Sequence, residues 1–98
     1  MFARTSSWSG SAETLERWAE HAEQTVKPFV AGLPGNAGAL FLIDRRSGQA
    51  LTLTLWDSEQ AAADTDTNAE QSRASTVQAT GIELVERGAW EIIAHLES

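Results

Sequence analysis

The sequence predicts a single α+β domain that covers residues 1–98, built in the order strand, helix, strand, strand, helix, strand. Two patterns predict this order. Apolar residues recur at helical spacing over residues 12–33, and extended apolar segments flank a short polar turn within residues 39–56. A chain of 98 residues suits one domain with one two-layer core. Its 42% of hydrophobic residues is typical of a chain that folds.

The first strand is predicted within residues 1–8, MFARTSSW. An extended segment would place Phe2, Arg4, Ser6 and Trp8 on one face. If that face is interior, Arg4 needs a carboxylate partner or an anionic ligand, because an unpaired buried charge is costly. Trp8 lies just before the Ser9–Ser11 segment that ends the strand, and it is expected to close the end of the barrel.

The first helix is predicted to start near residue 12. Ser11 can cap it, because its hydroxyl can accept a hydrogen bond from a free backbone N–H. Pro28 is expected to kink or interrupt the helix, and residues 32–35 to end it. His21 falls on the polar side and is expected to be solvated. One apolar stripe predicts the buried face: Leu15, Trp18, Ala19, Ala22, Val26, Phe29, Val30 and Leu33.

Residues 39–43 and 51–56 predict an antiparallel hairpin. The first segment, ALFLI, is apolar on both faces, as in a strand that is covered on both sides. Residues 44–48, DRRSG, supply the turn. The second segment, LTLTLW, alternates strictly, so Leu51, Leu53 and Leu55 share one face of the strand.

The second helix is expected to be broken or mobile. Asp57 or Ser58 can cap it, but residues 58–79 are rich in alanine and poor in large apolar side chains, and Thr65, Thr67 and Asn68 lower the helix propensity. It should end at residues 80–81. Residues 82–96 predict a last strand, in which Gly88 marks a bend or bulge and one face carries Trp90, Ile92, Ala94 and Leu96.

This order indicates a ferredoxin-like plait, a four-stranded antiparallel sheet with two helices on one face. The other face stays open. If Leu51 and its face mates point toward the helices, then Thr52, Thr54 and Trp56 point outward, and the sequence leaves open which face Trp56 occupies. A bare apolar face is rare in monomers, so we expect a homodimer through the open sheet face, enclosing a cavity lined by these polar groups.

Residues 56–61, WDSEQA, follow the third strand directly, and a turn with Leu33, Pro34, Gly35 and Gly38 leads into the second. With the element order, this motif resembles the antibiotic biosynthesis monooxygenase-like group of dimeric α/β-barrel proteins. The resemblance implies a homodimeric α/β barrel with a small-molecule cleft. The group includes oxygenases that act on aromatic polyketides without metal or flavin, and haem-degrading monooxygenases.

Haem degradation is disfavoured. That branch has an Asn on the first strand and a Trp and a His on the second helix, where this chain has Ser6 or Ser7, Ala63 and Ser72. We therefore expect no cofactor. Two readings remain: a small-molecule-binding protein that acts as a cofactor-independent monooxygenase on an aromatic or apolar compound, and a non-catalytic dimeric binding or stress-related module.

The candidate site residues follow from these expectations. The predicted lining of the pocket is Thr52, Thr54, Trp56, Arg4 and Ser6, although Trp56 also suits the core or the dimer contact. His95 is a candidate catalytic base, because on a strand it alternates with Glu91 and Ile93, so that a carboxylate could orient it. Trp18 and Trp90 are expected in the core. No metal site is expected, because nothing places His21 near His95.

The charge balance excludes several classes of partner. Fourteen acidic residues against seven basic ones give a net charge of -7, so neither nucleic acid nor an anionic membrane surface is an expected partner. The chain has no cysteine, which excludes disulfides and thiolate chemistry. No run approaches the roughly 18 apolar residues of a membrane span, and residues 1–5 lack the features of a signal peptide. A cytoplasmic protein is expected.

Overall fold

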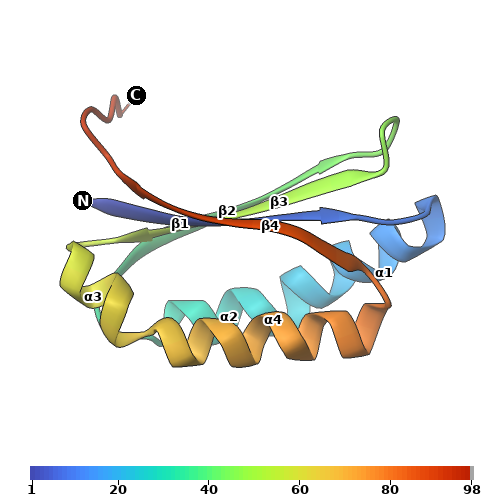
Figure 1. The fold of residues 1–98 in the computed structure, drawn as a ribbon, viewed down its shortest axis with the longest axis horizontal. Coiled ribbons are helices and arrows are strands. Elements are labelled where there is room, and N and C mark those ends of the chain that lie inside the picture. The colour runs from blue at the N-terminus through green and yellow to red at the C-terminus, as the bar shows by residue number, and fades with distance from the viewer. Residues whose placement is uncertain (98) are drawn as a thin grey trace.

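A computed structural model describes residues 1–97 and confirms the predicted ferredoxin-like plait (Figure 1). Its elements are β1 Phe2–Ser9, α1 Ala12–His21, the π-helix η1 Ala22–Val26, α2 Lys27–Ala31, β2 Asn36–Asp44, β3 Gln49–Trp56, α3 Glu59–Asp64, α4 Asp66–Thr80 and β4 Glu83–Glu91. The strands form one antiparallel sheet in the order β2-β3-β1-β4. The helices cover one face of this sheet and leave the other bare (Figure 1).

The first helical segment begins and breaks where the sequence predicts. Ser11 is the N-cap of α1, and its hydroxyl accepts a hydrogen bond from the backbone N–H of Thr14 at 3.2 Å. The interruption expected at Pro28 takes the form of η1, which ends at Val26, two residues before the proline. Proline lacks a backbone donor and crowds the preceding turn, so a locally wider helix accommodates it.

The second helical segment is broken, as predicted, and the break lies at Thr65. The Thr65 hydroxyl donates to the carbonyl oxygens of Ala61 and Ala62, at 2.9 and 3.2 Å, and its backbone leaves the helical region, with φ -103° and ψ 12°. A threonine hydroxyl that bonds back to the chain competes with the helical ladder. This break separates α3 from α4. Ser58 is the N-cap of α3, and Gly81 ends α4 with a positive φ of 77°.

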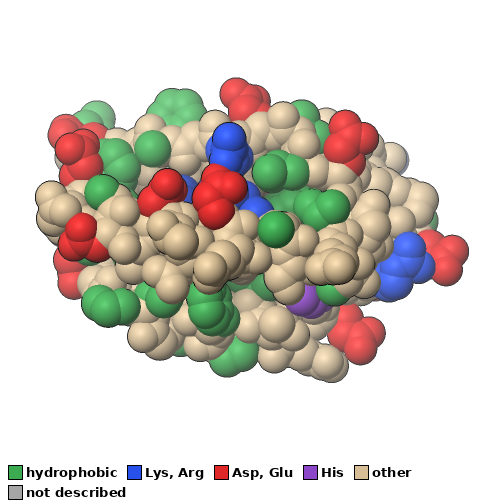
Figure 2. Space-filling view, turned by 60° about the horizontal axis from the view of Figure 1, so that its bottom comes forward, with side chains coloured by type: hydrophobic (Ala, Val, Ile, Leu, Met, Phe, Trp, Pro, Cys, Tyr) green, Lys and Arg blue, Asp and Glu red, His purple; other side chains and the backbone are tan. Residues whose placement is uncertain are grey.

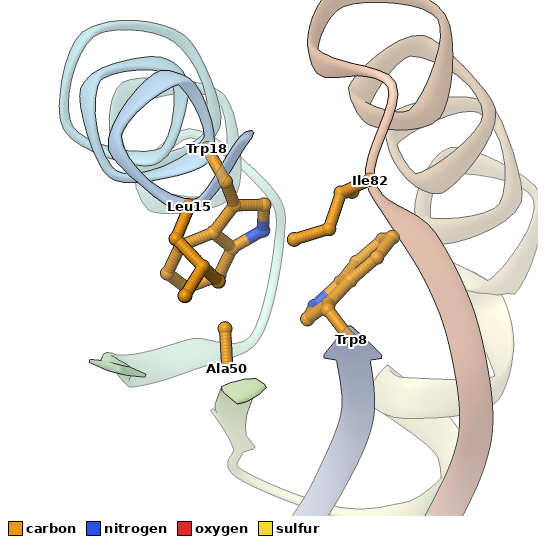
Figure 3. Close-up of a cluster of buried hydrophobic side chains, with 5 residues drawn as sticks. All are labelled: Trp8, Leu15, Trp18, Ala50 and Ile82. Atoms are coloured by element: carbon orange, nitrogen blue, oxygen red, sulfur yellow. The ribbon is translucent and has the colours of Figure 1, made fainter. Parts of the chain in front are cut away.

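The core lies between the helices and one end of the sheet. A cluster of buried side chains joins β1, α1, β3 and the segment before β4, and consists of Trp8, Leu15, Trp18, Ala50 and Ile82 (Figure 3). Trp18 is buried as predicted, and Trp8 lies inside this cluster. Leu15 is fully buried, so it contributes the full transfer free energy of its side chain.

The strand register decides which residues face the helices. Ser6 of β1 lies opposite Thr52 of β3, which lies opposite Phe41 of β2. All three line the space under the helices. The alternate residues Leu51 and Leu53 therefore lie on the bare face. Trp56 shares the helix side with Thr52 and is 1% exposed.

The last strand differs from the prediction. β4 ends at Glu91, and the chain beyond it rises on the side away from the helices (Figure 1). Trp90 was expected in the core but is 60% exposed, because it lies on the bare face of an edge strand. The irregularity expected at Gly88 lies elsewhere: the register shifts between the partners of Ser7 and Trp8.

Gly88 has a different role. A Cβ atom there would lie 2.6 Å from Trp90 Nε1 and 2.7 Å from Thr5 Oγ1. The indole of Trp90 thus lies close over Gly88 and donates a hydrogen bond to Thr5 Oγ1 at 3.0 Å. Glycine at this position lets an aromatic ring rest on the sheet.

No helix within the described residues 1–97 is long and apolar enough to cross a membrane.

Candidate functional site

A cavity of about 50 Å³ lies between the helices and the sheet. We call it the inner cavity. Strand residues Ser6, Thr52 and Thr54 supply hydroxyl groups to its wall, while helix residues, among them Trp18 and Val26, supply apolar surface. Helix α4 adds the polar residues Ser72, Arg73 and Thr76. Apolar walls with a few polar groups are typical of ligand sites.

The threonines of the inner cavity are paired with tryptophans. Trp8 Nε1 donates to Thr52 Oγ1 at 3.1 Å, and Trp56 Nε1 donates to Thr54 Oγ1 at 3.0 Å. The Thr54 hydroxyl in turn donates to the carbonyl oxygen of Arg4 at 3.3 Å. The alternation of LTLTLW explains this arrangement, because residues two apart on a strand share a face. Trp56 is therefore both a core residue and a fixed part of the structure behind the cavity.

Arg4 lies beside this layer and finds its partners within the same chain. Its guanidinium lies 5.2 Å from the centroid of the Trp56 ring, a cation–π contact. It also donates to the carbonyl of Ala62 and lies 3.9 Å from Asp66 Oδ1. Burial lowers the pKa of Arg4, nearby Asp66 opposes that shift, and nearby Arg73 adds to it.

A charged hollow of about 360 Å³ opens on the outer side of Arg4, and it is lined by Arg4, Asp66, Glu70, Arg73, Arg87, Gly88 and Ala89. One carboxylate oxygen of Glu70 accepts from Arg73, at 2.7 Å, and from Arg87. The hydrogen bond from Arg73, reinforced by the charges of Arg73 and Arg87, lowers the pKa of Glu70. Acidic and basic side chains gather beside one another on this side of the molecule (Figure 2). The network ties α4 to β4.

A groove of about 180 Å³ lies on the other side of the inner cavity, between the first helical segment and α4. We call it the helix groove. Its lining consists of His21, Thr25, Val26, Phe29, Gln71, Ser72 and Ser75. Val26 and Ser72 also line the inner cavity, so the two spaces adjoin.

His21 differs from the prediction of a solvated side chain. It is half-buried, and its Nε2 atom is shielded from solvent without a hydrogen-bond partner. The helical wheel could not show this, because α4 covers the side of the first helix that carries the histidine. Arg73 is a second residue that the sequence did not single out. The helix around it has no apolar stripe to mark its inner face.

Two further expectations concern His95 and the bare face of the sheet, and the structure differs from both. His95 lies in an exposed segment after β4 and not on a strand beside Glu91 and Ile93. The bare face carries a hollow of about 530 Å³, whose lining includes Leu51, Leu53 and Trp90. The chamber expected between two sheets would therefore be lined by leucines, while Thr52, Thr54 and Trp56 lie under the helices. Within residues 1–97, no cluster of three or more His, Asp or Glu side chains is suited to hold a metal ion.

Comparison with known protein sequences finds remote relatives of this chain. No protein-family model matches it. Two uncharacterized proteins of Mycobacterium tuberculosis, MT2634 of strain CDC 1551 and Rv2557 of strain H37Rv, are each 26% identical over 61 residues. The matched part is 62% of this chain but 27% of each relative, so the chain spans a minor part of their length.

Solved structures resemble the fold over nearly its whole length. A monooxygenase from the gene ActVA-Orf6 of Streptomyces coelicolor, in complex with the ligand nanaomycin D, is 19% identical with a TM-score of 0.71, and the match covers 99% of this chain and 92% of that one. SnoaB of Streptomyces nogalater, a cofactor-independent oxygenase, is 15% identical with a TM-score of 0.68, covering 99% and 97%.

A dimeric ferredoxin-like protein from an uncultured marine organism is 8% identical with a TM-score of 0.76, covering 99% of this chain and 98% of that one. Further structures that match are named as antibiotic biosynthesis monooxygenases. The resemblance to this group, inferred from the motif at Trp56, is thus confirmed at the level of the fold. Identities this low establish a shared architecture.

Proposed function

We propose that this protein binds a small aromatic or otherwise apolar molecule in the inner cavity and the adjoining helix groove. The observation that carries the proposal is the enclosure itself: hydroxyl groups and apolar side chains meet between the helices and the sheet, in a fold shared with a monooxygenase that holds a ligand.

The volumes bound the size of the ligand. The inner cavity of about 50 Å³ holds a few water molecules, since one water needs roughly 10–15 Å³ of such space. The helix groove of about 180 Å³ is comparable to a cavity of about 150 Å³ that can bind benzene. A single ring therefore fits the groove, and a larger ligand needs the two spaces to merge.

The finer proposal is a cofactor-independent monooxygenase. It is supported by the fold shared with SnoaB. In this mechanism the chain would hold a reactive substrate in a fixed orientation, away from bulk water, while oxygen reacts with it. The competing proposal is a binding protein without turnover. It is favoured by Thr54, whose hydroxyl accepts from Trp56 and donates to the carbonyl of Arg4, so that both of its hydrogen-bonding roles serve the structure.

We further propose a homodimer through the bare sheet face. Leu40 is 54% exposed, Leu42 is 45% exposed, and both lie beside Leu51 and Leu53 on this face. Contiguous exposed apolar surface usually marks an interaction site, and a second copy offers a self-complementary match. The match to a dimeric protein of the same fold supports this choice.

Binding and turnover can be tested together. Phenols with one, two and three rings are titrated while tryptophan fluorescence and oxygen consumption are recorded. Saturable quenching with oxygen uptake supports the enzyme, quenching alone supports the binder, and no saturable response to any compound contradicts both.

A matched pair of variants locates the ligand. Ser6→Val narrows the inner cavity, because Ser6 is 6% exposed and faces it, and should weaken the binding of ligands larger than one ring. Ser7→Val makes the same change on the opposite face of β1 and should leave binding unchanged. Equal effects of the two variants would place the ligand elsewhere.

The dimer is tested by light scattering after size-exclusion chromatography. We expect a mass of two chains for the natural sequence and of one chain for Leu42→Lys, since a lysine at this position would bury a charge in the contact. Gln78→Lys, on an exposed part of α4, is the control for added charge. A natural protein that stays monomeric at micromolar concentration contradicts the dimer.

A further inference from the structure

Two buried side-chain nitrogens within residues 1–97 have no hydrogen-bond partner, His21 Nε2 and Arg73 Nε. Buried polar groups are usually paired, so each exception needs a reason. Arg73 lines both the charged hollow and the inner cavity, and it is held there by a hydrogen bond that another of its nitrogens donates to Glu70. For the imidazole of His21, no acceptor or donor of the same chain meets Nε2.

The surroundings of His21 are those of a small binding site. It lies in the helix groove with the apolar side chains of Val26 and Phe29 on its own segment. Phe29 is 40% exposed, which leaves an aromatic ring available at the edge of the groove. The opposite wall comes from α4, where Gln71 is exposed and forms part of the lining.

The backbone next to His21 is unusual in an independent way. The π-helix η1 starts at the residue after His21 and supplies Thr25 and Val26 to the groove. Short π-helical turns interrupt α-helices at functional sites more often than elsewhere. Here the π-helical turn and the unpaired nitrogen fall on the same groove.

We propose that His21 Nε2 is the polar contact for the ligand, and that the ligand carries a hydroxyl group on an aromatic ring. This inference rests on the proposed binding function and specifies its ligand. The ring lies against Val26 and Phe29, and its hydroxyl pairs with the imidazole once the side chains that shield Nε2 from solvent have moved aside.

A hydroxyl group suits this position for a chemical reason. Neutral imidazole carries a hydrogen on one nitrogen only, so Nε2 is a donor in one tautomer and an acceptor in the other. A hydroxyl can both donate and accept, and so pairs with either form. A methyl group of similar size can do neither, and would leave Nε2 buried and unpaired. Phenol and toluene therefore form a matched pair of probes.

The test uses the full chain labelled with ¹⁵N at histidine. The two histidines, His21 and His95, give separate imidazole signals in long-range ¹H–¹⁵N spectra, and exposed His95 serves as an internal control. We expect phenol to shift the Nε2 signal of His21 saturably and to leave that of His95 in place. Toluene should change tryptophan fluorescence without a comparable shift at Nε2.

The affinities provide a second measurement. The ratio of phenol to toluene affinity should fall by about three- to tenfold in His21→Phe, the factor expected for one net hydrogen bond. His21→Gln, whose amide can donate and accept, should keep part of the preference. The spectra of the natural protein decide the question even if His21→Phe fails to fold.

The outcomes separate the two proposals. If phenol binds saturably but the His21 signal stays unchanged, or if His21→Phe keeps the full preference, this inference is wrong while the binding function stands. If neither these probes nor larger phenols bind saturably, the binding function fails and the inference fails with it.

Discussion

The indole–threonine pairs offer a controlled measurement of what burial does to a hydrogen bond. Trp56 Nε1 and Trp90 Nε1 each donate to a threonine hydroxyl at 3.0 Å, the first to Thr54 and the second to Thr5. The geometry is the same, but Trp56 is 1% exposed and Trp90 is 60% exposed. Replacing each threonine by valine removes the acceptor and keeps the shape of the side chain.

The expected costs differ because only one indole loses its hydrogen bond altogether. In Thr54→Val the N–H of Trp56 stays buried without an acceptor, which costs about 1–3 kcal/mol. The methyl group that replaces the hydroxyl offsets roughly 0.8 kcal/mol of this, so the net loss of stability should be about 0.2–2.2 kcal/mol. In Thr5→Val, water can replace the lost acceptor of Trp90, and the change should stay within about 0.5 kcal/mol.

Urea unfolding followed by circular dichroism measures both variants with no dependence on tryptophan emission. They are compared in the Leu42→Lys background, so that dimerisation does not cover Trp90. Thr54→Val should cost less in a Trp56→Phe background than in the natural sequence, because no indole N–H is then left unpaired. Equal costs for Thr54→Val and Thr5→Val would refute the reasoning, since burial would then make no difference.

Three further predictions concern stability. Leu15→Ala should cost about 2–5 kcal/mol in urea unfolding, because Leu15 is fully buried beside Trp8 and Trp18; a loss below 1 kcal/mol would mean that the cluster collapses around the gap. Gly81→Ala should cost about 1–2 kcal/mol for its positive φ alone, because nothing lies within 4 Å of the added Cβ. Gly35→Ala should cost more, because its Cβ would lie 2.5 Å from Ala61 Cβ. Equal melting temperatures for the two variants would contradict this contact. The lowered pKa of Glu70 means that its ion pairs stabilise the fold above the ordinary carboxyl pKa of about 4.3 and are lost as the pH falls through the lower folded value. Stability should therefore drop less steeply below about pH 4.3 in Glu70→Gln than in the natural protein, and parallel acid limbs would count against the network.

The sequence predicted the elements that depend on local chemistry. Ser11 and Ser58 cap helices because their hydroxyls reach the next free N–H groups. The second helical segment is broken at Thr65, one of three residues that lower its helix propensity. The strict alternation of β3 also predicted two distinct faces. Such features need only the neighbouring residues, so they can be read along the chain.

Which side chains face the helices could not be predicted from the sequence, because contacts between elements far apart in the chain decide it. Leu51 and Thr52 are equally suited to either side of a sheet until the helices are placed, and the helices cover the threonine side. Trp90 has a large apolar side chain of the kind usually found in a core, but it lies exposed on an edge strand. His21 looked solvated on its own helix, and only the position of α4 buries it.

Because successive residues of β3 point to opposite faces of the sheet, this single strand contributes to two separate surfaces. Its even-numbered residues, from Thr52 to Trp56, meet the space under the helices, and its odd-numbered leucines meet the bare face. Under the two proposals above, a substitution at one of the threonines acts on ligand binding, and a substitution at one of the leucines acts on the dimer contact. An insertion of one residue in β3 would exchange the two faces at once, so the length of this strand constrains both surfaces together.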